Sequence, residues 1–180
     1  KIAFWQIDAS DVKDYFMFNL TDGVYSKVLP VEYPSAGEAP SPYKIGVIEV
    51  GSGATKWMDV PGDPRQHYVP RMEWAANANE IILQQLNRKQ NESRLFLCNA
   101  STGKATNIHT EKDKAWIDVL STWDSNYNNG GWDWLNKGKE FLWASEKDGW
   151  RHLYRLSRDG KKEALITKGA YDVMSIVNVN

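Results

Sequence analysis

Apolar residues occur along the chain in short runs that are separated by clusters of polar turn residues. The run "EIILQQL", Glu80 to Leu86, has polar residues on both sides, and "RLFLCNA" follows it after the turn "NRKQNES". Gln, Leu, Asn and Arg would also tolerate a helix, but short apolar runs between turn residues are typical of strands. Helical periodicity is nearly absent elsewhere, so the pattern predicts an all-β protein.

The same order of runs recurs three times. Trp74 to Leu83, "WAANANEIIL", followed by "SRLFLCNASTGKATNI", aligns with Trp134 to Trp143, "WLNKGKEFLW", followed by "RHLYRLSRDGKKEALI". An earlier, truncated copy consists of "KIAFW" and "KIGVIEVGSGATKWM". Each copy contains a tight turn before its last strand, and a glycine, Gly53, Gly103 or Gly160, supplies the positive φ for that turn.

The repeat predicts the architecture. Units of about four strands that recur roughly every sixty to eighty residues are typical of β-propeller blades. Residues 1–180 are therefore predicted to form about three four-stranded blades. Because propellers typically have about four to eight blades, the ring is expected to be incomplete, with open sheet edges. The chain begins inside a predicted strand, "KIAFWQID", so we expect it to be a piece of a longer protein.

Two stretches interrupt the blade pattern. Residues 29–47, "LPVEYPSAGEAPSPYKIGV", contain four prolines, Pro30, Pro34, Pro40 and Pro42. Proline cannot donate to a central ladder, so a proline-rich arm or edge ribbon is predicted within residues 29–43. A plain loop and an interaction arm both remain open at this stage. The second stretch is the polar-aromatic loop "STWDSNYNNGGW", residues 121–132.

Composition and charge exclude some classes of function. Lys plus Arg is 22 and Asp plus Glu is 23, so the net charge of −1 gives no reason to expect binding to nucleic acid or to a membrane surface. Nine Trp and eight Tyr favour packing in sheets, with a carbohydrate or peptide groove as the alternative. The single cysteine, Cys98, cannot form an internal disulfide and is expected to be buried.

The sequence contains no pattern that would carry catalysis. It has no G-x-S-x-G elbow, and His67, His109 and His152 lie too far apart for metal-ligand spacing, so neither a metal nor a cofactor is expected. The string "SEKDGWRHLY" contains His152, which aligns with Arg94 of the previous copy. We therefore interpret His152 as a polar residue at the start of a strand and expect Trp150 to pack between blades.

Several segments together resemble the N-terminal β-propeller domain of the dipeptidyl peptidase IV family. They include "KIAFWQID", "TKWMDV", "HYVPRMEW", "LNRKQNESRLFL", "FLWASEKDGWRHLY" and "LITKGAYDVMSI", and they occur in the order of the family across essentially all 180 residues. The string "YPSAGEAPSP" resembles the proline-rich arm of the family's propeller.

The resemblance implies a function for the whole protein. Family members are extracytoplasmic (periplasmic, secreted or membrane-anchored) serine exopeptidases that remove N-terminal dipeptides, usually with Pro or Ala second. Their Ser-Asp-His triad lies in a C-terminal α/β-hydrolase domain and their amine-binding Glu pair lies upstream, both outside this chain. The chain would then be the non-catalytic portion that gates and shapes the substrate cavity. A peptide- or protein-binding propeller of an inactive relative is the alternative, and an unrelated sugar-binding or scaffold propeller is a third.

The resemblance also implies partners and site residues. The partners would be a peptide substrate, the protein's own hydrolase domain and a second copy in a homodimer, but no nucleic acid. The arm residues expected at the dimer contact are Val31, Glu32, Tyr33, Pro34, Pro40 and Pro42. Trp123 and Tyr127 are expected to line the substrate cavity, with solvated loop side chains as the alternative for both sets.

Overall fold

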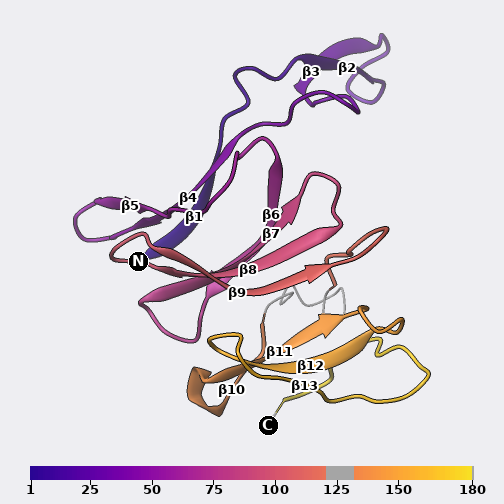
Figure 1. Ribbon diagram of the computed structural model, residues 1–180. Coiled ribbons are helices and arrows are strands. Elements are labelled where there is room, and N and C mark those ends of the chain that lie inside the picture. The colour runs from indigo at the N-terminus through magenta and orange to yellow at the C-terminus, as the bar shows by residue number, and fades with distance from the viewer. Residues whose placement is uncertain (121–131, 180) are drawn as a thin grey trace.

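The computed structural model describes residues 1–120 and 132–179, and this part of the chain is built almost entirely from antiparallel strands (Figure 1). The strands are β1 (Ile2–Ile7), β2 (Asp14–Asn19), β3 (Lys27–Glu32), β4 (Tyr43–Ile48), β5 (Thr55–Trp57), β6 (His67–Trp74), β7 (Glu80–Asn87), β8 (Glu92–Asn99), β9 (Ala105–Lys112), β10 (Trp134–Leu135), β11 (Glu140–Ser145), β12 (His152–Ser157) and β13 (Glu163–Leu165). One 3₁₀ turn, η1 (Asn136–Gly138), connects β10 to β11.

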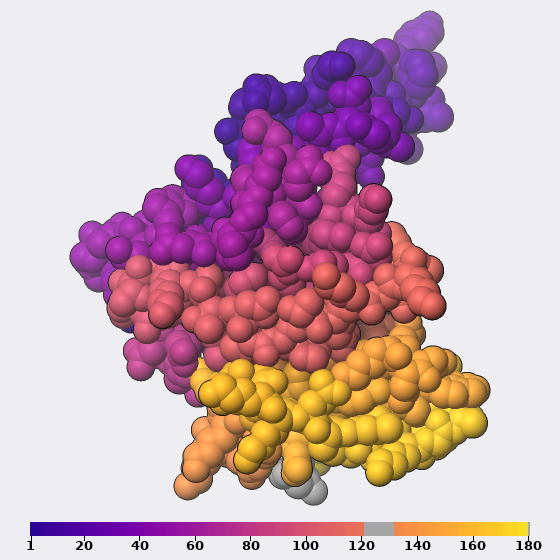
Figure 2. All heavy atoms as spheres, viewed as in Figure 1, coloured from indigo at the N-terminus to yellow at the C-terminus, as the bar shows by residue number. Residues whose placement is uncertain are grey.

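Three of the sheets are blades that follow one another along the chain. Blade 1 has the order β1-β4-β5, blade 2 the order β6-β7-β8-β9, and blade 3 the order β10-β11-β12-β13. Figures 1 and 2 show them as successive layers that do not close into a ring. The predicted all-β fold of an incomplete propeller is thus confirmed. Blade 1 has three strands where the other two have four, as expected from the truncated first copy of the repeat.

The core lies in two layers between the blades, and β7 contributes to both. Ile82 packs with residues of blade 3 such as Phe141 and Leu156, whereas Ile81 and Leu83 pack with Ile45 and Val47 of blade 1. Successive side chains of a strand point to opposite faces of the sheet. The continuous apolar run in "EIIL" therefore reflects a strand that is buried on both faces.

The predicted turns and the buried cysteine are confirmed. Gly53, Gly103 and Gly160 have φ angles of 71°, 84° and 71°, a region that residues with a Cβ seldom adopt. Cys98 is fully buried, and this burial, together with the charge of Asp59, raises the pKa of its thiol to about 12. The thiol is therefore protonated and unreactive at neutral pH.

Three features differ from what the sequence predicted. Asp14–Asn19 forms a strand, β2, that pairs with β3 in a separate two-stranded hairpin, which was not predicted from the sequence. Of the predicted arm, residues 29–32 belong to β3, residues 33–42 form the connection to β4, and Tyr43 begins β4. Trp150 does not pack between blades, because it lies on the turn before β12 with 41% of its surface exposed.

Candidate functional site

The β2–β3 hairpin, which we call the projecting hairpin (residues 14–32), carries large apolar side chains that face solvent. Phe16 and Phe18 are 64% and 70% exposed, and Tyr15 is 52% exposed. The two strands pair only with each other, and Figure 1 shows them extending away from the blades. A lone hairpin has no second layer to cover either face, so these side chains stay in contact with water. Exposed apolar surface of this kind marks an interaction site.

Both faces of the projecting hairpin are apolar. The register places Phe16, Phe18, Val28 and Pro30 on one face, and Tyr15, Met17, Leu29 and Val31 on the other. A strand exposed on one face would alternate apolar with polar residues, and β2 does not. Pro30 is tolerated here because a strand of a two-stranded hairpin has one free edge on which no N–H is needed.

The six predicted arm residues divide into two groups. Val31, Glu32 and Tyr33 are exposed at the end of the projecting hairpin, where the ring of Tyr33 meets that of Tyr15 edge-on with centroids 6.5 Å apart. The three prolines, Pro34, Pro40 and Pro42, are instead half-buried near the blades. The structure therefore brings the first group to an exposed surface and the second to the base of the hairpin.

The base of the projecting hairpin forms one wall of an apolar groove. Pro34 and Pro40 line this groove of about 500 Å³ together with Trp5 of β1 and with His67 and Tyr68 of β6. The indole N–H of Trp5 donates to the carbonyl oxygen of Val69 at 3.2 Å, which ties blade 1 to blade 2 beside the groove. The prolines thus pack at the junction of two blades instead of extending the hairpin.

Polar contacts attach the same base to blade 2. The guanidinium of Arg88, on the β7–β8 turn, donates to the carbonyl oxygen of Glu38 at 2.6 Å. The carboxylate of Glu38 lies 3.7 Å from Lys13, and Arg65 pairs with Asp11 at 2.9 Å. These contacts lie on both chain segments that lead into the projecting hairpin, and Arg88 connects its base to blade 2.

Trp123 and Tyr127, the residues predicted to line the substrate cavity, lie outside the described residues. The chain is described again from Trp132, whose backbone N–H donates to the carboxylate of Glu73 on β6 at 2.8 Å. The guanidinium of Arg71, also on β6, lies over the ring of Trp132 at 5.4 Å. Burial raises the pKa of Glu73 and lowers the pKa of Arg71, so β6, an edge strand of blade 2, holds two charged groups in a poorly solvated position.

His152 is the first residue of β12, as predicted, but it is 2% exposed. Its Nδ1 lies 2.8 Å from the carboxylate of Asp148, and its ring packs edge-on against that of Tyr171 at 5.9 Å. Among the described residues its Nε2 has no hydrogen-bond partner. This geometry stabilises the β11–β12 turn, and in the described part of the chain no Ser, Thr or Cys nucleophile is bonded to the imidazole.

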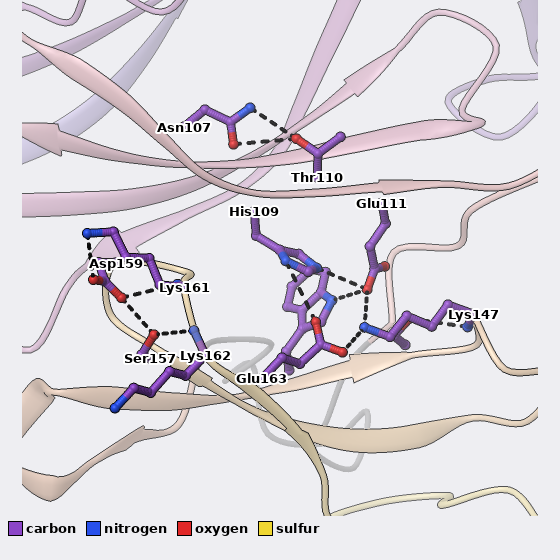
Figure 3. Close-up of polar contacts among 12 residues, drawn as sticks. Asn107, His109, Thr110, Glu111, Lys147, Ser157, Asp159, Lys161, Lys162 and Glu163 are labelled. Atoms are coloured by element: carbon purple, nitrogen blue, oxygen red, sulfur yellow. Dashed lines mark hydrogen bonds and ion pairs between the residues drawn. The ribbon is translucent and has the colours of Figure 1, made fainter.

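A second polar cluster joins blades 2 and 3 (Figure 3). His109 and Glu111 of β9 point toward Lys147 and Glu163 of blade 3. The Nε2 of His109 lies 3.2 Å from Glu111, its Nδ1 lies 4.0 Å from Glu163, and Lys147 pairs with both carboxylates. Burial raises the pKa of Glu111, but the hydrogen bond and charge of His109 and hydrogen bonds from Trp143 and Ser145 outweigh it, so the pKa is lowered. The cluster is thus a charged contact between neighbouring blades.

Residues 1–120 and 132–179 contain neither a metal-ligand cluster nor a membrane-spanning helix. In these residues no three His, Cys, Asp or Glu side chains are grouped so that they could hold a metal ion. Nor does this part of the chain contain a helix of the length and apolar character needed to cross a membrane.

Comparison with known families identifies one that matches throughout. The family described as the dipeptidyl peptidase IV (DPP IV) N-terminal region matches residues 1–180. The probable dipeptidyl peptidase 4 of Emericella nidulans is 26% identical over an alignment that covers 92% of this chain and 22% of that protein. The inactive dipeptidyl peptidase 10 of Mus musculus is also 26% identical, over 98% of this chain and 23% of its own length.

Solved structures show the same relationship. The crystal structure of Porphyromonas gingivalis dipeptidyl peptidase 4 superimposes with a TM-score of 0.82 at 29% identity, covering 99% of this chain and 24% of that one. A putative dipeptidyl aminopeptidase IV from Bacteroides ovatus gives a TM-score of 0.71 at 25% identity, covering 93% of this chain and 25% of that one. The chain therefore spans about a quarter of the length of the relatives it matches.

Proposed function

Because the chain belongs to the dipeptidyl peptidase IV N-terminal region family, we propose that it is the non-catalytic propeller portion of a serine exopeptidase that removes N-terminal dipeptides with Pro or Ala second. The observation that carries the proposal is the match over residues 1–180 combined with the superposition on Porphyromonas gingivalis dipeptidyl peptidase 4. The chain's blades would form part of the wall around the substrate cavity, and the protein's own C-terminal α/β-hydrolase domain would supply the Ser-Asp-His triad.

In this role the blades contribute shape and polarity to the cavity. A charge that is held in a poorly solvated position interacts strongly with a peptide, because the surrounding dielectric is low. Arg71 and Glu73 on β6 are such groups, and Trp132 places the end of the loop 121–132 directly against them. Trp123 and Tyr127 of that loop would contact side chains of the peptide, and the whole protein would act outside the cytoplasm.

The test of this function is peptidase activity in the full-length protein. We expect hydrolysis of Gly-Pro-p-nitroanilide and covalent labelling by a fluorophosphonate probe, since that probe reacts with an activated serine. Trp123→Ala and Tyr127→Ala should raise KM severalfold and leave kcat nearly unchanged, because they remove contacts made equally in the bound substrate and in the transition state. Trp150→Ala, an exposed tryptophan on the β11–β12 turn, is the matched control. Unchanged KM values in both variants would contradict the assignment of the loop.

A second function is favoured by one observation, the similarity to inactive dipeptidyl peptidase 10 of Mus musculus over 98% of this chain. In that case the parent protein would bind peptides or proteins without cleaving them. The fluorophosphonate experiment separates the two functions: labelling of the full-length protein excludes a binding-only role, whereas absence of both labelling and hydrolysis, with retained peptide binding, supports it.

We also assign the projecting hairpin to contact between two copies of the parent protein. Its support is the exposed apolar surface on both faces of β2 and β3. Burying this surface against a second copy would remove it from water, which favours association by about 25 cal/mol for each Å².

Substitutions on each face of the projecting hairpin test this contact. Phe16→Glu with Phe18→Glu changes one face, and Tyr15→Glu with Met17→Glu changes the other. At least one double variant should be monomeric in sedimentation, while the wild type is dimeric and Lys89→Glu, on the β7–β8 turn, remains dimeric. A monomeric wild type, or two dimeric double variants, would contradict the assignment.

A further inference from the structure

A large groove, lined mostly by polar and charged residues, lies where blades 2 and 3 meet. It has a volume of about 1550 Å³ and is lined by three turn regions that are far apart in sequence. These are the β8–β9 turn with Thr102 and Lys104, the η1 turn (Asn136–Gly138), and the β12–β13 turn from Ser157 to Lys162. The groove thus exists only when two blades pack against each other, and neither blade could form it alone.

The lining of this groove is strongly basic, although the chain as a whole carries a net charge of −1. Six cationic side chains line it, against three carboxylates. The cationic residues are Lys104, Lys137, Lys139, Arg158, Lys161 and Lys162. A cleft lined by charges of one sign concentrates the electrostatic field and attracts ligands of the opposite sign.

The three carboxylates are already engaged by protein groups. Glu80 accepts a hydrogen bond from Arg158, and Asp159 lies 3.5 Å from Lys161. Glu140 accepts from Asn136 and lies 3.6 Å from Arg155, outside the groove. The other four lysines of the lining, Lys104, Lys137, Lys139 and Lys162, have no carboxylate within ion-pair distance among the described residues. Their positive charge is therefore available to a ligand.

The backbone beneath these lysines is held in place by contacts between the blades. Arg158 donates to the carbonyl oxygen of Ala75 in blade 2 at 3.0 Å and to that of Gly138 in blade 3 at 2.9 Å. The β12–β13 turn lies so close to β9 that a Cβ on Gly160 would be 1.5 Å from the carbonyl oxygen of Ile108. Lys161 and Lys162 therefore follow a turn that has no room to move toward β9.

The η1 turn is held in an unusual conformation. Asn136, Lys137 and Gly138 have consecutive positive φ angles of 50°, 57° and 79°. Residues with a Cβ adopt this region only where surrounding contacts impose it, and such positions cluster at functional sites. Here the contacts are those of Asn136 with Glu140 and of Gly138 with Arg158. Together they present Lys137 to the groove on a fixed turn.

The neutral part of the lining narrows the class of ligand. Hydroxyl and carboxamide groups of Asn99, Thr102, Thr106, Asn107 and Ser157 line the groove, and no aromatic side chain does so among the described residues. Binding of single-stranded nucleic acid relies largely on aromatic stacking of the bases, which this lining does not offer. Hydroxyl and amide groups bind sugar hydroxyls, and lysine ammonium groups bind sulfate and carboxylate.

From this juxtaposition of three lysine-bearing turns we propose that the groove between blades 2 and 3 binds an acidic polysaccharide that carries sulfate or uronate groups. This site is separate from peptide cleavage and does not rest on the peptidase function. The ligand would run along the junction of the blades, with its anionic groups at Lys104, Lys137, Lys139 and Lys162 and its hydroxyls at the neutral side chains.

The test is a calorimetric titration of the full-length protein with a heparin-derived octasaccharide, which measures the Kd. The triple variant Lys104→Gln, Lys137→Gln, Lys162→Gln should bind at least about tenfold more weakly than wild type, because three of the charge-assisted contacts are lost. The matched control is Lys89→Gln, Lys114→Gln, Lys168→Gln, which removes the same charge from exposed lysines outside the groove and should change Kd less than about twofold. Thermal unfolding of both variants verifies that they are folded.

A second measurement does not depend on any variant. Acetylation of the wild-type protein, read by mass spectrometry, should be slowed at Lys104, Lys137, Lys139 and Lys162 by the octasaccharide, and not at Lys89 or Lys168. The proposal is overturned if the octasaccharide does not bind, if the control variant loses as much affinity as the groove variant, or if the protected lysines lie elsewhere. Equal or tighter binding of poly-glutamate at the same site would also overturn it, because the groove would then select acidic peptides.

Discussion

Strands β7 and β2 share a pattern of consecutive apolar residues but lie in opposite environments. Each contains a run of consecutive apolar residues, "IIL" in β7 and "YFMF" in β2. Ile81, Ile82 and Leu83 are fully buried, whereas Phe16 and Phe18 are 64% and 70% exposed. The difference lies in their neighbours: β7 has a strand on each edge and a blade on each face, and β2 has one paired strand and no covering layer.

This difference shows that a run of apolar residues has two structural meanings. In a strand between two blades, such a run indicates that the strand is buried on both faces. In a hairpin that projects from the fold, such a run indicates an exposed surface that another molecule can cover. Local propensity favours a strand in both cases, so only the surrounding layers decide which meaning applies.

The largest difference in stability between the two strands is expected when an apolar side chain of each is truncated to alanine. Ile82→Ala should lower the free energy of unfolding by about 2–5 kcal/mol, because it leaves a cavity between blades 2 and 3. Phe18→Ala should change it by less than about 0.5 kcal/mol, since the ring is already solvated. Denaturant titration followed by tryptophan fluorescence measures both. Similar losses in the two variants would mean that the projecting hairpin is packed in solution.

A second pair of variants compares a glycine turn that contacts another strand with a glycine turn that contacts none. Gly53 and Gly160 share a φ of 71°, but a Cβ on Gly53 would meet nothing within 4 Å, whereas one on Gly160 would overlap the carbonyl oxygen of Ile108. Gly53→Ala should therefore cost about 1–2 kcal/mol from backbone strain alone. Gly160→Ala should cost about 1–3 kcal/mol more, because β9 and the turn must separate. Equal melting temperatures for the two variants would disprove the close contact.

The smallest effect concerns the pH dependence contributed by the buried Glu111 and the half-buried Glu73. The pKa of Glu111 is lowered from 4.5, with hydrogen bonds and charge outweighing burial, so its ionised form stabilises the fold above that pH and this contribution is lost as the pH falls. The pKa of Glu73 is raised from 4.5 by burial, so its contribution is present at low pH and is lost as the pH rises through the raised pKa.

Replacement of each glutamate by glutamine checks these signs. Glu111→Gln should be less stable than wild type at pH 7, and the difference should shrink as the pH falls below about 4.5. The stability of Glu73→Gln relative to wild type should instead rise between pH 4 and pH 7. The measurement is the free energy of unfolding at several pH values. Parallel curves for either variant and wild type would show that the corresponding glutamate has the same pKa in the folded and unfolded chain.

The sequence by itself determined the elements that depend on local chemistry. Short apolar runs predicted β7 and β8. Tight turns required the positive φ of Gly53, Gly103 and Gly160. The repeat of these features along the chain identified the blades. Such features are readable because strand pleating and turn geometry are imposed over a few neighbouring residues.

Tertiary structure alone decided which surfaces meet. It exposed Trp150, buried His152 against Asp148, and packed Pro34 and Pro40 at the base of the projecting hairpin while leaving Val31 exposed. It also brought Lys104, Lys137 and Lys162 together in one groove. The physical reason is that the burial of a side chain and the electric field around it depend on neighbours contributed by other blades. The residues next to it in the sequence do not indicate which distant segment will cover it.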